Sequence, residues 1–341
     1  MSLLKVAVIG CGSIAIHRHL PEYNANPNVE IVAVCDVIEE RAQEAAEKYQ
    51  AKAYTDYKQA ITESDADLVS VCLPNYLHAP VSIFAAENGK HVLCEKPMAT
   101  SDEEAKQMIA ASEKAGKKLM IAHNQRFVAS HQKAREIIAN GDLGKIYSFR
   151  TTFGHGGPEG WSIDGADSWF FRKEEAFIGA LGDLGVHKAD VIRYILDTEF
   201  VEVASMIESS AKENSDVDDQ AVTILRSEKG IIGTLTASWA YKDGEDNSTV
   251  IYGEKGNLRL EDDPTYSLIA RFTDGTKVNY DLGQIQTNDS GGQTSSGVVD
   301  HFVHSVLNDT KPLIDGEEGY KSLKIILAAL EANESKKNIS L

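Results

Sequence analysis

The tripeptide Glu95-Lys96-Pro97 places a lysine where a β-rich run of the sequence ends. Lysine is almost never fully buried without a partner, so a lysine at the end of a buried strand indicates a need for its charge or its proton. An ion pair with Glu95 is the structural alternative, but neighbouring residues of a strand point to opposite faces. A lysine in this position can donate a hydrogen bond to a substrate oxygen and stabilise negative charge that develops there.

Asp183 and His187 are a second pair whose spacing indicates chemistry. They are four residues apart, and therefore lie on one face if both are helical. A lone histidine that opens an amphipathic helix is more often a capping or core residue, which is the structural alternative. His187 can titrate near neutral pH and act as a general base, while Asp183 can hold a second hydroxyl. Together the three residue types could remove a proton from a hydroxyl and stabilise the charge left behind, so we predict that Lys96, Asp183 and His187 are catalytic.

Residues 8–15, VIGCGSIA, have the glycine spacing of a dinucleotide-binding turn. Gly10 permits a tight turn, Gly12 lets the backbone approach a pyrophosphate, and Ala15 is small enough for close packing. Asp36 ends the next β-rich run, where its carboxylate can accept hydrogen bonds from ribose hydroxyls and would repel a 2′-phosphate. We predict NAD rather than NADP, although Arg41 could reach the site. A plain glycine turn with a surface aspartate is the alternative.

Further segments are expected at the same edge of the sheet. Pro74-Asn75 and His78 follow another β-rich run, and ligands of such sheets bind at the carboxyl ends of the strands, although these residues could merely form a turn. The residues predicted to contact the cofactor are Gly10, Gly12, Ser13, Ile14, Asp36, Leu73, Pro74, Asn75, His78, Glu95, Lys96 and Gln125.

The loop over residues 154–173, rich in glycine, aspartate and aromatic residues, is predicted to form the outer wall of the substrate site. Its aromatic side chains could equally pack into the core. The residues predicted to contact the substrate are Arg126, His155, Trp169, Asp183 and His187, with Trp161, Asp164 and Tyr241 as weaker candidates.

Alternating strands and helices are expected to position these residues in the first third of the chain. Continuous apolar runs predict strands buried on both faces at residues 5–10, 29–36, 67–74, 91–97 and 118–124. Helical patterns separate them at residues 38–49, 80–89 and 101–116, the last with Ser101 and Glu104 at capping-box spacing and Gly116 as its stop. This alternation predicts a doubly wound parallel sheet, an α/β domain over residues 1–126.

The pattern changes in residues 127–341. After a helix at 128–141 and a strand at 145–153, a helix at 184–196 precedes β-runs with turns at residues 228–230, 254–256 and 274–275, which predict hairpins. We expect an α+β domain with an open, mainly antiparallel sheet that carries substrate and oligomer contacts. Helices at 298–308 and 317–337 are expected to pack back on the first domain.

The composition of the chain argues against several classes of function. The net charge of −18 over 341 residues disfavours nucleic-acid and anionic-membrane partners. No apolar run approaches the length of a membrane span, and residues 1–10 have no secretory leader pattern, so we expect a cytoplasmic protein. The four cysteines form no CxxC pair and the scattered histidines form no ligand pattern, so no metal site is predicted.

These motifs together resemble the Gfo/Idh/MocA oxidoreductase family. The resemblance rests on GxGxxA at 10–15, Asp36, Pro-Asn-x-x-His at 74–78 and Glu-Lys-Pro at 95–97, and continues through residues 124–127, 181–196 and 252–258. It implies a Rossmann first domain and hydride transfer between a nicotinamide and a secondary alcohol, with the catalytic triad of polyol dehydrogenation at Lys96, Asp183 and His187. It also implies a small polyol, sugar or cyclitol substrate and a homodimer or homotetramer.

Two other functions stay open for a chain of this kind. The resemblance also covers glycosidases that keep NAD bound and use it transiently. A non-catalytic sugar or nucleotide sensor is the third possibility, against which the joint presence of Lys96, Asp183 and His187 argues.

Overall fold

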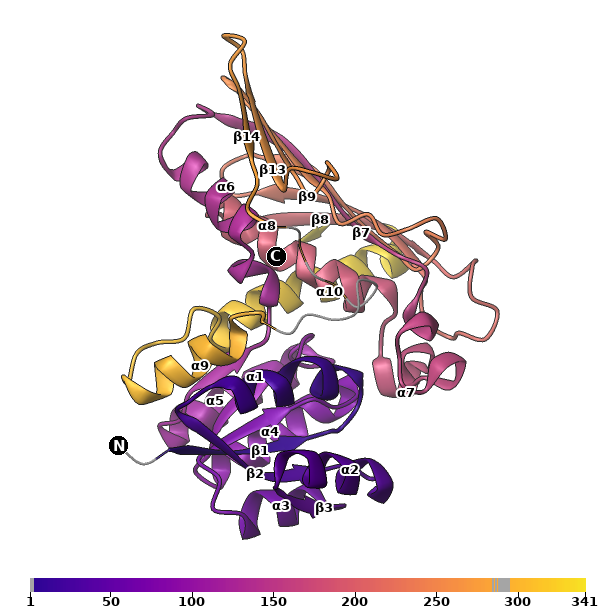
Figure 1. Ribbon diagram of the computed structural model, residues 1–341. Helices are drawn as coiled ribbons and strands as arrows, with labels where there is room; N and C mark the ends of the chain where they lie inside the picture. Colours follow the sequence, from indigo (N-terminus) through magenta and orange to yellow (C-terminus); the bar gives the residue numbers. More distant parts are fainter. Residues whose placement is uncertain (1–2, 284, 286, 288–294) are drawn as a thin grey trace.

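A computed structural model describes residues 3–283, 285, 287 and 295–341 (Figure 1). The first domain is built on a six-stranded sheet of order β3-β2-β1-β4-β5-β6, in which every neighbouring pair is parallel. The strands are β1 (Leu4–Ile9), β2 (Val29–Cys35), β3 (Lys52–Tyr54), β4 (Leu68–Val71), β5 (His91–Cys94) and β6 (Leu119–Ile121). The helices are α1 (Leu20–Ala25), α2 (Glu39–Tyr49), α3 (Tyr57–Glu63), α4 (His78–Glu87) and α5 (Asp102–Ala115). The predicted doubly wound sheet is confirmed.

Local sequence explains these elements. All four residues of β4 are buried, as expected of a strand covered on both faces. Ser101 caps α5 by accepting a hydrogen bond from the Glu104 amide at 3.2 Å, and Gly116 ends the helix with φ of 62°. The Glu104 carboxylate accepts from the Thr100 amide, one residue before the cap.

The second domain contains a nine-stranded sheet of order β14-β13-β12-β11-β7-β10-β9-β8-β15. Its neighbours are antiparallel except β7 and β10, which are parallel, and the three predicted hairpins are present. The strands are β7 (Ile146–Gly154), β8 (Phe200–Glu208), β9 (Gln220–Ser227), β10 (Ile232–Ser238), β11 (Thr249–Gly253), β12 (Gly256–Leu260), β13 (Leu268–Phe272), β14 (Lys277–Tyr280) and β15 (Ile339–Ser340). The predicted open, mainly antiparallel sheet is confirmed.

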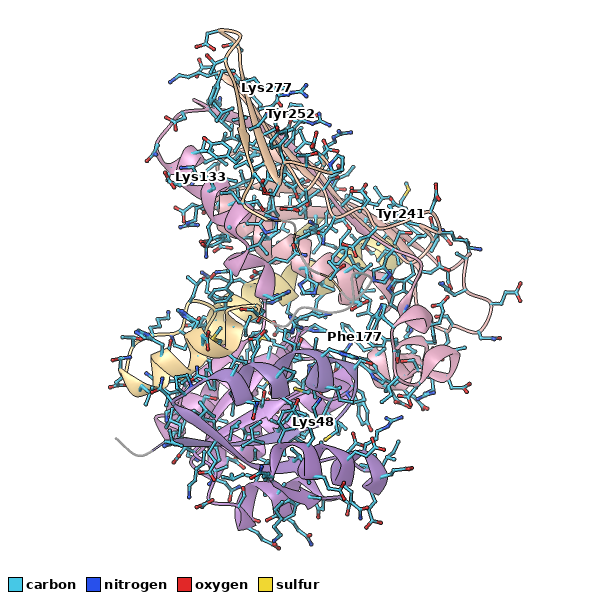
Figure 2. The ribbon with its side chains drawn as sticks, in the orientation of Figure 1. Lys48, Lys133, Phe177, Tyr241, Tyr252 and Lys277 are labelled. Carbon is cyan, nitrogen blue, oxygen red and sulfur yellow. The ribbon has the colours of Figure 1, made fainter. Side chains whose placement is uncertain are left out.

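Helices pack on one face of this sheet. The helices of this part of the chain are α6 (Ala129–Ala139), α7 (Lys173–Ala176), α8 (Val186–Leu196), α9 (Val298–Leu307) and α10 (Gly316–Ser335). Apolar residues of α6, α8 and α10 share one core with the sheet, whereas alternate residues of β9 are exposed on the other face. Lys133 on α6 and Tyr252 on β11 mark the two sides of the sheet (Figure 2).

The end of the chain joins the two domains. Phe302 of α9 and Leu323 of α10 belong to the same core as the strands of the first sheet, and the Ile121 amide donates to the Ile314 carbonyl at 2.9 Å. In Figure 1, α9 lies beside the first domain and α10 runs towards the second sheet. In the part of the chain that the structure describes, no helix has the length and apolar character to cross a membrane.

Candidate active site

A cavity of about 560 Å³ lies between the carboxyl edge of the first sheet and the second domain. It begins at the glycine turn after β1 and reaches the start of α8, so residues from both domains line it. The predicted site residues that line it are Gly10, Gly12, Ser13, Ile14, Asp36, Leu73, Pro74, Asn75, Glu95, Lys96, Gln125, His155, Trp169, Asp183 and His187.

Lys96 leaves the end of β5 towards the second domain. Its ammonium Nζ donates to Asp183 Oδ1 at 2.8 Å and to the Asp183 carbonyl at 2.9 Å. The neighbouring Glu95 is held by Arg18 at 3.1 Å and by His19 at 2.8 Å. The two adjacent side chains therefore have different partners, and Lys96 is the one directed across the cavity.

Glu95 lies in a buried charge cluster behind this lysine, 4% exposed. Burial raises the pKa of its carboxyl, but Arg18, His19 and Lys96 outweigh burial, so the pKa is lowered. The carboxylate stays ionised and fixes Arg18, which also lines the cavity.

Asp183 sits in a widened helical turn, the π-helix η7 (Leu181–Gly185), which runs directly into α8. The Asp218 carboxylate anchors the start of this turn by accepting from the amides of Gly179 at 2.7 Å and Leu181 at 2.8 Å. Trp239 Nε1 donates to Asp183 Oδ2 at 3.2 Å. Both oxygens of Asp183 are thus oriented, one by Lys96 and one by Trp239. Single π-turns of this kind often occur at functional sites.

His187 lies one turn further along, in the first turn of α8, and faces the same cavity. The rings of Phe153 and His123 lie 5.8 and 6.3 Å from it, centroid to centroid. Burial lowers the pKa of His187 well below its ordinary value, and the Lys96 charge lowers it further. The imidazole is therefore unprotonated at neutral pH, the form that a general base needs.

The glycine turn fits a dinucleotide. Gly10 has φ of 96°, and a Cβ there would lie 2.1 Å from the Cys72 carbonyl oxygen, so only glycine permits this approach of β1 to β4. A Cβ on Gly12 would meet nothing within 4 Å, and this open space belongs to the cavity. Asp36 braces the turn by accepting from the amides of Cys11 and Ile38, both at 2.9 Å. These features match a turn that cradles a pyrophosphate beside a ribose-binding carboxylate.

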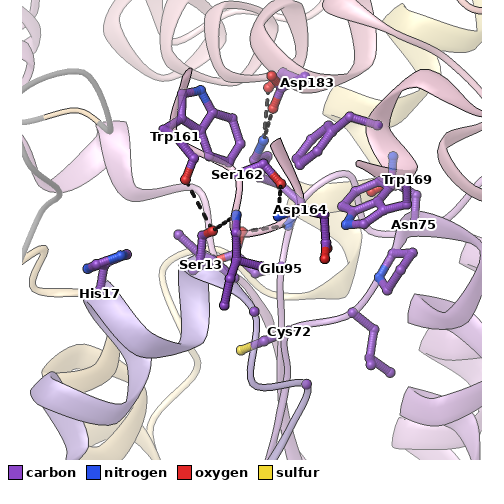
Figure 3. Close-up of a pocket in the computed structure, with 18 of the residues that line it drawn as sticks. Ser13, His17, Cys72, Asn75, Glu95, Trp161, Ser162, Asp164, Trp169 and Asp183 are labelled. Atoms are coloured by element: carbon purple, nitrogen blue, oxygen red, sulfur yellow. Dashed lines mark hydrogen bonds and ion pairs between the residues drawn. The ribbon is translucent and has the colours of Figure 1, made fainter. Parts of the chain in front are cut away.

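A segment of the second domain, Trp161–Asp164, crosses over this turn, and we name it the clasp. Ser13 Oγ donates to the Trp161 carbonyl at 3.2 Å and accepts from the Ile163 amide at 2.9 Å (Figure 3). The Asp164 carboxylate forms an ion pair with Arg41 on α2. The clasp thus bridges the two domains over the part of the cavity next to Asp36.

Comparison with known proteins agrees with this geometry. Residues 4–123 match the model of the oxidoreductase family with an NAD-binding Rossmann fold, and residues 131–259 match the GFO/IDH/MocA C-terminal domain. The chain belongs to the Gfo/Idh/MocA oxidoreductase family. The family and the NAD-binding first domain predicted from the sequence are confirmed.

Relatives of this Gfo/Idh/MocA chain include sugar dehydrogenases. D-glucoside 3-dehydrogenase of Escherichia coli is 29% identical over 100% of this chain and 98% of its own length. Levoglucosan dehydrogenase of Pseudarthrobacter phenanthrenivorans is 32% identical over 76% of this chain and 73% of its own. Among solved structures, aldose-aldose oxidoreductase of Caulobacter crescentus complexed with glycerol has a TM-score of 0.85 and 26% identity, covering 99% of this chain and 100% of its own.

Three predicted contacts of this Gfo/Idh/MocA protein, His78, Arg126 and the weaker candidate Tyr241, are not brought to the cavity. His78 does not line it, because its ring nitrogens lie 2.7 and 2.8 Å from the carbonyl oxygens of Pro97 and Leu73, where the side chain braces two strand ends. Arg126 does not line it either, because Asp190 and Glu318 bind its guanidinium at distances of 2.7 to 2.9 Å. The structure therefore places His78 against two strand ends and Arg126 in an ion-pair cluster, both outside the lining of the cavity.

Several other residues line the cavity without having been predicted from the sequence. Most belong to the loop between β7 and α8, where no periodicity indicates which side chains turn inward. They include Arg18, Ser162, Ile163, Phe170, Arg172 and Glu175. Within the residues that the structure describes, no group of three or more His, Cys, Asp or Glu side chains could hold a metal ion.

Proposed function

We propose that the chain is an NAD-dependent dehydrogenase that oxidises a secondary hydroxyl of an uncharged sugar, sugar derivative or cyclitol, and reduces the ketone in reverse. The observation that carries this proposal is the convergence of Lys96, Asp183 and an unprotonated His187 in a cavity that begins at the glycine turn. The names of the dehydrogenase relatives support the substrate class.

Each side chain of the triad has a defined task. The bound nicotinamide supplies the hydride acceptor in oxidation and the donor in reduction. His187 takes the hydroxyl proton and returns it in the reverse direction. Lys96 has three N–H donors and uses two on Asp183, so the third can bind the reacting oxygen and stabilise its developing negative charge. Asp183 keeps lone pairs on its oxygens to accept from a second substrate hydroxyl.

The aromatic side chains of the loop between β7 and α8 suit a sugar-like ring. Trp169 and Phe170 stack with their ring centroids 3.9 Å apart, and Trp161 meets Phe170 edge-on at 5.2 Å. Flat aromatic faces with a few polar groups are typical of small-molecule sites. His155 belongs to the same loop, and its Nδ1 accepts from the Gly157 amide at 2.9 Å.

The charges of the cavity favour an uncharged substrate. Four lysine and arginine side chains line the described part of the cavity, and each is paired with a carboxylate. The pairs are Arg18–Glu95, Arg41–Asp164, Lys96–Asp183 and Arg172–Glu175. A carboxylate or phosphate on the substrate would have to compete with these carboxylates for a cation, or stay buried without a partner. A neutral hydroxyl has no such penalty in free energy.

The test is NADH formation over a panel in which each neutral sugar, glycoside or inositol is matched with its uronate or phosphate. We expect turnover of neutral members, and a loss of about 100-fold or more in Lys96→Ala and in His187→Ala. The matched controls Lys48→Ala and His304→Ala change exposed residues outside the cavity and should keep full activity.

Two outcomes would contradict the proposal. Undiminished turnover in both triad variants would exclude the assigned roles. Release of NAD from the denatured protein, without net NADH formation on any panel member, would favour a glycosidase that uses its cofactor transiently.

A further inference from the structure

The adenosine end of the cofactor groove is closed by a contact from the other domain. Ser13 of the glycine turn is hydrogen-bonded twice to the clasp, and Arg41 of α2 is ion-paired to Asp164 at its end. Asp36, Arg41 and Asp164 all line the same cavity. A dinucleotide whose ribose meets Asp36 would therefore lie beneath the clasp.

The Arg41–Asp164 ion pair affects the choice between NAD and NADP. NADP differs from NAD by a phosphate on the adenosine ribose, and a protein accepts that group through a nearby arginine. The helix that follows Asp36 is α2. Among its described residues, Arg41 is the one lysine or arginine that lines the cavity. Its guanidinium is occupied by a carboxylate that comes from 123 residues further along the chain.

We propose that Asp164 determines the preference for NAD over NADP from the opposite domain, by neutralising Arg41 and latching the clasp over the adenosine ribose. Asp36 and Asp164 then place two carboxylates where a 2′-phosphate would lie, while the ribose hydroxyls of NAD can still donate to Asp36. This inference rests on the proposed binding of a nicotinamide cofactor.

Removing the charge of Asp164 should release the arginine. In Asp164→Asn we expect the ratio of the dissociation constants, Kd for NADP over Kd for NAD, to fall by about tenfold or more, the size of one charge-assisted hydrogen bond. Both constants can be measured by quenching of protein fluorescence, since Trp161 and Trp169 line the cavity. Glu174→Gln is the matched control, because it removes one negative charge from the same loop at an exposed residue outside the cavity and should leave the ratio unchanged.

Two further variants distinguish the effect of a free Arg41 charge from the effect of losing the Arg41–Asp164 ion pair. Arg41→Met removes the ion pair without freeing a cation, so NADP should gain nothing, and in Asp164→Asn/Arg41→Met the tenfold gain should disappear. Both single variants should release NADH faster than the native chain in stopped-flow displacement, because each loses the latch.

An unchanged ratio in Asp164→Asn, or an equal fall in Glu174→Gln, would overturn the inference. If the native chain bound neither nicotinamide, the proposed function itself would fail. That result is distinct from native binding of NAD with a ratio that Asp164 does not affect.

Discussion

The surroundings of His187 disfavour protonation of its imidazole, although the Glu95 carboxylate acts weakly in the opposite direction. The ring is buried, and Lys96, His123 and Arg18 add to the effect of burial. A histidine with a lowered pKa keeps its base form at pH values where an exposed imidazole is half protonated. The environment of the residue, and not its type alone, therefore suits it to accept a proton from an alcohol.

This environment predicts the acid limb of the pH profile. Because the pKa of His187 is lowered in the folded enzyme, the base form persists at pH 6.5, the ordinary imidazole value, and is lost only at lower pH. We expect kcat/KM for alcohol oxidation, measured against pH at saturating NAD, to have its acid limb below 6.5. A limb at or above that value, with the protein still folded by circular dichroism, would contradict the assignment of His187 as an unprotonated base.

At the residue scale, the sequence indicates which side chains line the cavity better than it indicates which residues hold them there. The positions of Lys96 and His187 in the cavity could be predicted because each follows a recognisable local pattern, the end of a buried strand and the start of a helix. The partners that aim them could not, since Trp239 reaches Asp183 across 56 positions and Asp218 anchors the π-turn from beyond α8. No local spacing encodes such contacts. Arg126 shows the reverse case: its motif position is conspicuous, but its side chain turns to Asp190 and does not line the cavity.

At the scale of one element, the two glycines of the turn after β1 have different tasks. We expect Gly10 to be needed for folding, and Gly12 for binding the cofactor. Gly10→Ala would force a side chain into a left-handed backbone and against the Cys72 carbonyl, so we expect a loss of about 2 kcal/mol or more in the free energy of unfolding. Gly12→Ala meets no protein atom within 4 Å, so stability should change by no more than about 0.5 kcal/mol. Its methyl group would instead occupy space proposed for the pyrophosphate, and NAD affinity should fall at least tenfold.

Urea denaturation and NAD titration of the two glycine variants test this division. Each variant serves as the control for the other. An equal loss of stability in both variants, or native NAD affinity in Gly12→Ala, would contradict these separate roles of Gly10 and Gly12.

Elements with a continuous local signal were predictable, and those defined by distant partners were not. The helix α5 carries its own cap at Ser101 and its own stop at Gly116, and it forms where predicted. The strand β3 has only three residues and was missed, because it becomes a strand by pairing with β2. The parallel pairing of β7 with β10 joins segments about 80 residues apart, which hairpin signals cannot reveal.

At the scale of the whole molecule, the helix-free face of the second sheet exposes a row of apolar side chains. Met206 is 79% exposed, Ile224 55%, Val222 49% and Ile232 46%, and all lie on the adjacent strands β8, β9 and β10. Contiguous apolar side chains exposed on one face are typical of sites where proteins associate. We propose that two copies of the chain pack through this face, the self-complementary arrangement of most homo-oligomers.

Ile224→Lys tests the interface. The substitution places a charge at the centre of the patch, so light scattering coupled to gel filtration should show the native chain as an oligomer and the variant shifted towards the 37.2 kDa protomer. Leu307→Lys, on α9 and 37% exposed, is the matched control and should keep the native mass. A native chain that elutes as a protomer at all concentrations would exclude the proposed interface.

The return of the chain to its first domain has a consequence for biosynthesis. Phe302, Val303, Ile314 and Leu323 complete a core whose strands lie within the first 121 residues. While the ribosome is still translating the second sheet, the emerging first domain lacks these side chains and leaves the apolar surface that they cover open to water. Nascent chains generally fold domain by domain from the amino end, but here the first domain to emerge is completed only when α9 and α10 have left the ribosome. Until then, it presents a surface that a chaperone can bind.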